Sequence, residues 1–187
     1  MDRLSFARPQ DIGLDADQLQ RAGELLQRWC DADHLPAAAL CVGRKGSVVE
    51  PRFFGRMRPD KDSPALRKDA LFLIASITKP VTVTAVMMLV ERGELTLSDP
   101  VAKFVPRFAA AGKGEVQVRH LMTHSSGLPD MLPDNIKLRM ANKPLAAFID
   151  ATCELPPLYP PGTQVGYQSM GTAMLSEIVH QPCKKLF

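Results

Sequence analysis

The stretch Ser76-Ile77-Thr78-Lys79-Pro80 stands at the head of a nearly apolar run, Val81 to Val90, and it decides how this chain is interpreted. A serine and a lysine three positions apart on a helix share one face, one turn from each other. That spacing lets an amine take the proton of a hydroxyl, which is how Ser-Lys nucleophiles are activated. Such a tetrad is common by chance, so its meaning depends on the rest of the chain.

Composition limits the classes of protein to consider. The 187 residues suffice for one domain with a buried core, or for part of a larger one. Hydrophobic residues make up 45% and charged residues 23%, and the basic residues behind the net charge of +3 are scattered, which predicts a globular protein with no nucleic-acid partner. Met1 to Phe6 lacks the apolar core of a secretion signal, and Val81–Val90 is too short to cross a bilayer. We therefore expect a cytoplasmic protein without a membrane span.

The hydrophobic pattern predicts several helices. Asp15 is suited to cap a helix over 15–32, in which Leu19, Ala22, Leu25, Leu26 and Trp29 recur at helical spacing. Further helices are expected over 76–92, 116–122, 144–153 and 169–180, with a turn and a short helix within 95–108 that Pro106 ends. In the helix over 76–92 the stripe expected to be buried is Val81, Ala85, Met88 and Leu89. The remainder of 130–162 is expected to be irregular.

Two strands are predicted, Ala37–Gly43 and Ser47–Phe54, joined at Arg44-Lys45-Gly46 as a hairpin whose glycine permits a positive φ. A hairpin of two strands is marginal in water and needs further strands or a covering helix. No later segment of the chain reads as a strand that could pair with it. We therefore expect that part of the sheet is missing from this chain.

The residues around the tetrad suit a nucleophile. Ser76 lies where the helix begins, and the positive end of the helix dipole favours an alkoxide-like oxygen there. Lys79 is followed by proline and apolar residues, and burial in such surroundings makes an amine a usable base. The alternative is a helix-capping serine beside a lysine that extends to solvent.

A second candidate element is Tyr167-Gln168-Ser169, which follows Pro161-Gly162-Thr163 and precedes an apolar helix. A phenol close to a lysine ammonium ionises more easily and can relay protons as a general acid and base. The alternative is a core tyrosine packed under a loop.

With these elements in place, the sequence resembles the serine β-lactamase-like hydrolases of the penicillin-recognising fold, and within them class C β-lactamases and family VIII carboxylesterases. Four blocks carry the resemblance in the family's order over residues of about 11–180. They are Ser76-Ile77-Thr78-Lys79-Pro80-Val81-Thr82, Gly93-Glu94-Leu95-Thr96-Leu97-Ser98-Asp99-Pro100-Val101, Leu121-Met122-Thr123-His124-Ser125-Ser126-Gly127-Leu128-Pro129, and Pro161-Gly162-Thr163 with Tyr167-Gln168-Ser169.

The resemblance implies an α+β fold, with the N-terminal helix and β-hairpin of the family plus its helical subdomain. It implies Ser76 as the acylated nucleophile, Lys79 as its proton acceptor and Tyr167 as the acid/base, with the backbone N–H of Ser76 in the oxyanion hole. Ser169 would contact substrate. The substrate would be a small ester, amide or β-lactam, and no metal or organic cofactor is implied.

Two departures from the family pattern stand out. Ser169 occupies a position that is commonly Asn, and a hydroxyl has a shorter reach than an amide. The family's third motif, a Lys-Thr-Gly or His-x-Gly triplet on a late strand, has no counterpart here, and residues 181–187 lose the family's character. We therefore expect residues 1–187 to be a C-terminally truncated hydrolase domain. The alternative function is an inactive family member that acts, if at all, by binding.

His120 and His124 are four residues apart and could in principle hold a metal from one helix face. Leu121 stands where the metalloprotease pattern needs Glu, and no third ligand is evident. We expect structural roles for both histidines, with His124 bonding locally in its turn.

Overall fold

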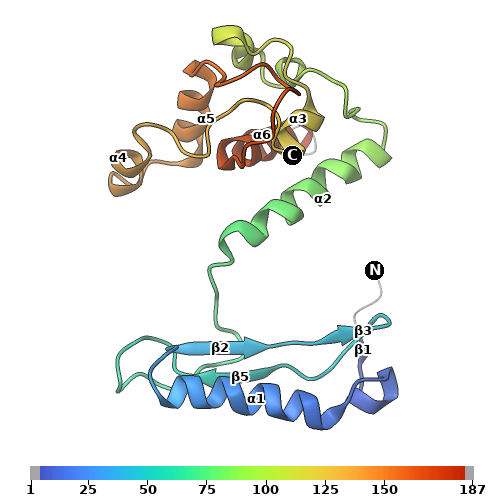
Figure 1. Cartoon of the computed structure of the whole chain (residues 1–187), viewed down its shortest axis with the longest axis vertical. Coiled ribbons are helices and arrows are strands. Elements are labelled where there is room, and N and C mark those ends of the chain that lie inside the picture. Colours follow the sequence, from blue (N-terminus) through green and yellow to red (C-terminus); the bar gives the residue numbers. More distant parts are fainter. Residues whose placement is uncertain (1–4, 184–187) are drawn as a thin grey trace. The chain divides into compact units, whose positions relative to one another are not determined.

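The computed structural model describes residues 5–183, which form two compact units (Figure 1). The first extends to Leu73 and holds one long helix with short strands, and we call it the sheet unit. The second begins at Ile74 and holds the remaining helices, and we call it the helical unit. The predicted mixture of helices and strands is confirmed. Residues 184–187 of the atypical tail lie outside the described part.

The sheet unit is organised by α1 (Ala16–Asp31), which packs against β2 (Ala37–Leu40) and β5 (Arg52–Gly55). Asp15 caps the helix as predicted, because its carboxylate accepts the backbone N–H groups of Asp17 and Gln18 at 2.9 and 3.1 Å. A single turn of 3₁₀ helix, η1 (Pro9–Ile12), precedes it.

The predicted hairpin is present but interrupted. β2 pairs antiparallel with β5, and β3 (Gly43–Arg44) pairs antiparallel with β4 (Ser47–Val48). Between β3 and β4, Lys45 and Gly46 both adopt a positive φ, 53° and 77°, as a turn matching the twist of the strands requires. β1 (Ser5–Phe6) lies parallel to β4 and adds a third strand that the sequence did not predict.

The helical unit is built around α6 (Ser169–Cys183), which contacts α2, α3 and α5 (Figure 1). Its remaining elements are η2 (Ala75–Ile77), α2 (Thr78–Glu91), η3 (Val101–Lys103), η4 (Pro106–Gly112), α3 (Val118–Met122), α4 (Asn135–Met140) and α5 (Leu145–Glu154). α4 falls in the stretch expected to be irregular. Pro106 begins η4 rather than ending a helix, because its fixed φ suits a first helical position.

The core of the helical unit consists of apolar side chains from α2, η3, η4, α3, α5, α6 and the connections between them. Fully buried members include Val86 from α2, Phe108 from η4, Leu121 from α3, Ile149 from α5 and Leu175 from α6. Packing of this kind fixes the helices against one another, because interiors are as dense as organic crystals.

The stripe predicted for α2 is only partly correct. Leu89 is buried, but Val81 is 62% and Met88 47% exposed, and Val86 takes the central core position. α2 is apolar on nearly every face, so hydrophobic periodicity does not indicate which face meets α6.

Nowhere in residues 5–183 does a helix combine the length and the apolar character needed to cross a bilayer.

Candidate active site

Ser76 occupies the short η2 turn directly before α2. The preceding residue, Ala75, has a φ of 44°, a left-handed conformation that residues with a side chain rarely adopt. Strained backbone of this kind clusters at functional sites, where the surroundings hold a side chain in one orientation. The Ser76 side chain is exposed at this point of the helical unit.

Two side chains that the sequence singled out, Lys79 and Tyr167, meet at the Ser76 oxygen. Lys79, on the first turn of α2, donates from Nζ to Ser76 Oγ at 3.1 Å. Tyr167, ninety-one positions later in the chain, donates its hydroxyl to the same oxygen at 2.8 Å. The interpretation of Lys79 as a side chain extending freely to solvent therefore does not describe the structure. Tyr167 is 53% exposed, so it is not a core tyrosine either.

The ammonium of Lys79 also acts on the phenol of Tyr167. Nζ lies 4.8 Å from the centre of the Tyr167 ring, within the range of a cation–π contact. The interaction with Lys79 and then the hydrogen bond to Ser76 lower the pKa of Tyr167 below its ordinary value, against the smaller opposing effects of desolvation and of the Asp130 charge. The phenolate is therefore more accessible here than in an isolated tyrosine.

Ser169 joins this network from the first residue of α6. Lys79 Nζ donates to Ser169 Oγ at 3.2 Å, while Ser169 donates both its backbone N–H and its hydroxyl to one carboxylate oxygen of Asp130, at 2.9 and 2.7 Å. A hydroxyl has only one proton. Because that proton goes to Asp130, Ser169 can only accept from Lys79, and the direction of this hydrogen bond is set.

The segment that carries Tyr167 is held by the turn around residues 124–128. Gln168 is buried; its amide oxygen accepts the hydroxyl of Ser126 at 2.6 Å, and its amide nitrogen donates to the carbonyl of His120 at 3.2 Å. The ring of His124 packs against the Tyr167 ring with 4.8 Å between centres. This turn therefore positions the phenol relative to Ser76.

Gly127 is required at the tip of that turn. Its φ is 80°, and a Cβ added there would come within 2.3 Å of the Tyr159 carbonyl oxygen. The close approach lets the Gly127 carbonyl accept the N–H of Leu158 at 2.8 Å, which ties the turn to the loop leading to Tyr167.

The two histidines have structural partners. His120 Nδ1 accepts the backbone N–H of Gln117 at 3.1 Å and caps α3. His124 Nδ1 accepts the N–H of Gln168 at 3.3 Å, so its partner is forty-four positions away and the expectation of a bond within its own turn was wrong. Within residues 5–183 no group of three or more His, Cys, Asp or Glu side chains is arranged to hold a metal ion.

A pocket of about 410 Å³ opens beside Ser76. It lies between α2, α3 and α6 and is lined by Ser76, Lys79, Pro80, Val83, Leu121, Met122, His124, Tyr167, Thr172 and Leu175. Half of the lining residues are apolar, and the polar groups are the Ser76 and Thr172 hydroxyls, the Lys79 amine, the His124 ring and the Tyr167 phenol. Pockets of this kind orient small molecules with a few polar contacts.

Sequence reasoning missed Asp130 entirely. The residue directly follows Pro129, the last residue of the block that resembles the family, and nothing in its local sequence distinguishes it from a solvent-exposed turn residue. Its partner Ser169 is thirty-nine positions away, so the pair is visible only once the chain is folded.

Comparison with known proteins shows which family the chain belongs to. The family model described as Beta-lactamase matches residues 18–185. Esterase EstB of Burkholderia gladioli is 36% identical over 125 residues, which cover 64% of this chain and 32% of EstB. Penicillin-binding protein 4 of Amycolatopsis lactamdurans is 34% identical over 150 residues, 78% of this chain and 38% of that protein.

The fold is also shared with solved structures. EstCE1, a hydrolase with promiscuous acyltransferase activity, superposes with a TM-score of 0.74 at 22% sequence identity, over 90% of this chain and 48% of EstCE1. The arrangement is thus that of part of a β-lactamase/transpeptidase-like fold. The chain spans about a third of the length of the two curated relatives and about half of the solved structure. Since the family model covers most of its residues, the chain belongs to the β-lactamase family of serine β-lactamase-like proteins and esterases.

Proposed function

We propose that this protein is a serine hydrolase that is acylated on Ser76 and acts on small esters, with amides and β-lactams as the other candidate substrates. The observation that carries the proposal is the convergence of Lys79 Nζ and the Tyr167 hydroxyl on Ser76 Oγ, at 3.1 and 2.8 Å. Two proton-transfer groups within hydrogen-bond reach of one hydroxyl satisfy the geometric requirement for an activated nucleophile.

In the acylation step, Ser76 Oγ attacks the carbonyl carbon of the substrate, and its proton passes to Lys79. A neutral lysine amine has two protons and one lone pair. When Lys79 acts as the base, Ser169 accepts one of these two N–H groups and the lone pair faces the Ser76 hydroxyl, which reverses the hydrogen bond that Lys79 donates to Ser76 in the structure. The tetrahedral intermediate then collapses as the bond to the leaving group breaks.

Tyr167 is suited to deliver a proton to the departing alcohol or amine. Its hydroxyl touches Ser76 Oγ, so it lies next to the leaving group when the acyl bond forms. In the second half of the reaction the roles reverse: Tyr167 as phenolate takes a proton from water, and the water oxygen attacks the acyl carbon. The bond between that carbon and Ser76 Oγ then breaks, and Lys79 returns its proton to Ser76 Oγ. The lowered pKa of the phenol favours this second role.

Asp130 acts as a positioning residue in this scheme. It touches neither substrate nor the reacting atoms, but it fixes the hydroxyl of Ser169 as an acceptor and thereby orients the amine of Lys79. Ser169 remains a candidate substrate contact, because its hydroxyl is only half-buried.

The names of the relatives define the substrates to try. EstB is named an esterase and penicillin-binding protein 4 is named for penicillin binding, so a test should contain both ester and β-lactam. We expect the purified chain to release p-nitrophenol from p-nitrophenyl acetate and butyrate, with a fluorescent penicillin as the β-lactam arm. Ser76→Ala serves as the control, with circular dichroism and a thermal melt to show that both proteins are folded.

The outcome expected is turnover that requires Ser76. Turnover that persists unchanged in Ser76→Ala would contradict the proposal, because another group would then be the nucleophile. A folded chain that binds the ester without releasing product would favour the other candidate, a family member that acts by binding.

A further inference from the structure

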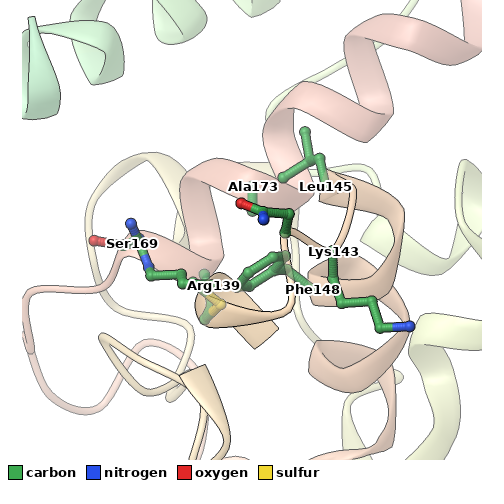
Figure 2. A pocket seen from close by; sticks show the side chains of 8 residues that line it. Arg139, Lys143, Leu145, Phe148, Ser169 and Ala173 are labelled. Atoms are coloured by element: carbon green, nitrogen blue, oxygen red, sulfur yellow. The ribbon is translucent and has the colours of Figure 1, made fainter. Parts of the chain in front are cut away.

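A second pocket, distinct from the one beside Ser76, lies between α4, α5 and the start of α6. It measures about 650 Å³ and is lined by Arg139, Asn142, Lys143, Leu145, Phe148, Ser169, Met170 and Ala173 (Figure 2). We call it the α4–α6 groove. In Figure 2, Arg139 and Lys143 flank Phe148 on opposite sides, and Ser169 lies on the side of Arg139.

The groove combines an apolar floor with two cations. Leu145, Phe148, Met170 and Ala173 supply the apolar surface, and Leu145 remains 53% exposed although it is a large aliphatic side chain. Neither Arg139 nor Lys143 forms an ion pair with any other residue of the described part of the chain. A site of this composition favours a ligand with an apolar body and an anionic end.

No carboxylate lines the groove to neutralise these cations. Asp130 bonds Ser169, one of the lining residues, but among the described residues it forms no ion pair with Arg139 or Lys143. The positive charge of Arg139 and Lys143 is therefore available to a ligand. Arginine in particular binds a carboxylate with a planar pair of N–H groups.

Ser169 connects this groove to the reacting centre. It lines the groove, and its hydroxyl also accepts from Lys79, which in turn donates to Ser76. The Ser76 and Ser169 hydroxyl oxygens are thus close together, because both are hydrogen-bonded to the same Lys79 nitrogen. A substrate whose carbonyl lies at Ser76 has the groove within reach of a short chain.

We propose that the α4–α6 groove selects esters whose apolar arm ends in a carboxylate, which Arg139 binds on the side of Ser169 while Lys143, on the other side of Phe148, adds positive charge. The proposal rests on the hydrolase function proposed for Ser76. It adds a substrate class: half-esters of dicarboxylic acids, or esters of a carboxylate-bearing alcohol, in preference to neutral esters of the same size. In both kinds of ester the group that the groove would recognise is a carboxylate at the end of an apolar arm.

The experiment measures kcat/KM for matched pairs of esters. The acyl arm compares p-nitrophenyl half-esters of succinate, glutarate, adipate and suberate with the same compounds in which the free carboxylate is a primary amide. The alcohol arm compares 4-butyryloxybenzoate with its neutral benzamide counterpart. We expect a preference of about fivefold for the anion in at least one arm, and a loss of that preference at high salt.

Charge-neutralising variants assign the preference to the groove. Arg139→Gln and Lys143→Gln are each expected to reduce the ratio of anionic to neutral kcat/KM, by about fivefold for the pair combined. Lys137→Gln is the matched control, because Lys137 lies on α4 and carries the same charge but does not line the groove. It should leave the ratio unchanged.

A binding measurement separates failure of this inference from failure of the hydrolase proposal. Ligand-observed NMR on Ser76→Ala should show tighter binding of the glutarate half-ester than of its amide, and Arg139→Gln in that background should remove the difference. If neutral esters are hydrolysed but neither kcat/KM nor binding favours the anionic compounds, the carboxylate-binding role of the groove is wrong and the hydrolase function of Ser76 stands. If the half-ester binds more tightly than its amide but no ester is hydrolysed, the carboxylate-binding role of the groove is supported and the hydrolase function is wrong.

Discussion

The two units of this chain differ in how they bury apolar surface. The helical unit has a contiguous core, with Phe108, Ile149 and Leu175 fully buried, whereas the buried apolar residues described in the sheet unit are Ile12, Cys30 and Phe54. The proposed reacting groups all belong to the helical unit, from Ser76 to Ser169. The comparison indicates that a well-packed unit positions the site, while the sheet unit has strands of only two to four residues.

The largest effect is expected from removing the amine that the helical unit holds at Ser76. Lys79→Ala should lower acyl transfer by about 10²–10⁴-fold, the range typical of general-base loss. It should also return the pKa of Tyr167 toward its ordinary value, since Lys79 is the main cause of the lowering. Ester hydrolysis and an ultraviolet titration of the phenol measure the two effects, with Tyr159→Phe to remove the signal of the other tyrosine. If the pKa of Tyr167 is the same in Lys79→Ala, Lys79 does not contact the phenol as described.

A pair of core truncations tests the difference in packing directly. Phe108→Ala should destabilise the helical unit by about 3–5 kcal/mol and abolish acylation, because the side chain is fully buried among α5 and its neighbours. Phe54→Ala, at 5% exposure, should loosen the sheet unit and leave the Lys79–Ser76 contact in place. Hydrogen exchange followed by mass spectrometry reports each unit separately. Equal loss of protection in both units after either change would show that they do not behave as separate units.

A smaller effect is expected at Asp130, where the helical unit orients Lys79 through Ser169. Asp130→Ala should lower kcat by about tenfold with little change in KM, because a hydrogen bond to a charged group is lost. Asp130→Asn keeps an acceptor for Ser169 and should retain more activity. In a Ser169→Ala background, Asp130→Ala should have almost no further effect. Additive losses in the double variant would show that Asp130 acts by another route.

The smallest effect concerns pH and the cap of α3. Burial, with a contribution from Arg119, lowers the pKa of His120, so the ring is neutral in the folded helical unit and accepts the N–H of Gln117. The unfolded chain takes up a proton below about pH 6.5. Stability contributed by neutral His120 is therefore present above that pH and is lost as the pH falls toward the lowered pKa. Urea titrations at pH 7.5 and about 5.5 should show this loss, and His120→Gln should reduce it. A pH dependence identical in the variant would exclude His120 as its source.

Much of the local structure could be predicted because single residues dictate it. Asp15 predicts the start of α1, and Gly46 predicts the turn in the hairpin, since each satisfies a backbone requirement in its own neighbourhood. The approach of Lys79 to Ser76 follows from helical spacing in the same way.

The remaining features depend on contacts between distant segments. α4 begins after Asp134 in a stretch rich in proline, and β1 exists only because Ser5 and Phe6 pair with β4. The role of Asp130 could not be predicted from the neighbouring residues, because its partner Ser169 comes from α6. The buried face of α2 could not be identified either, because a helix that is apolar all round carries no periodic contrast.

Whether Ser76 is the nucleophile is tested most directly by treating the folded chain with a fluorophosphonate and locating the label by intact mass and peptide mapping. We expect one adduct, on Ser76, that forms more slowly in Lys79→Ala and is absent in Ser76→Ala. A label on Ser125 or on a serine of the sheet unit, or no label on a sample with a cooperative melt, would contradict it.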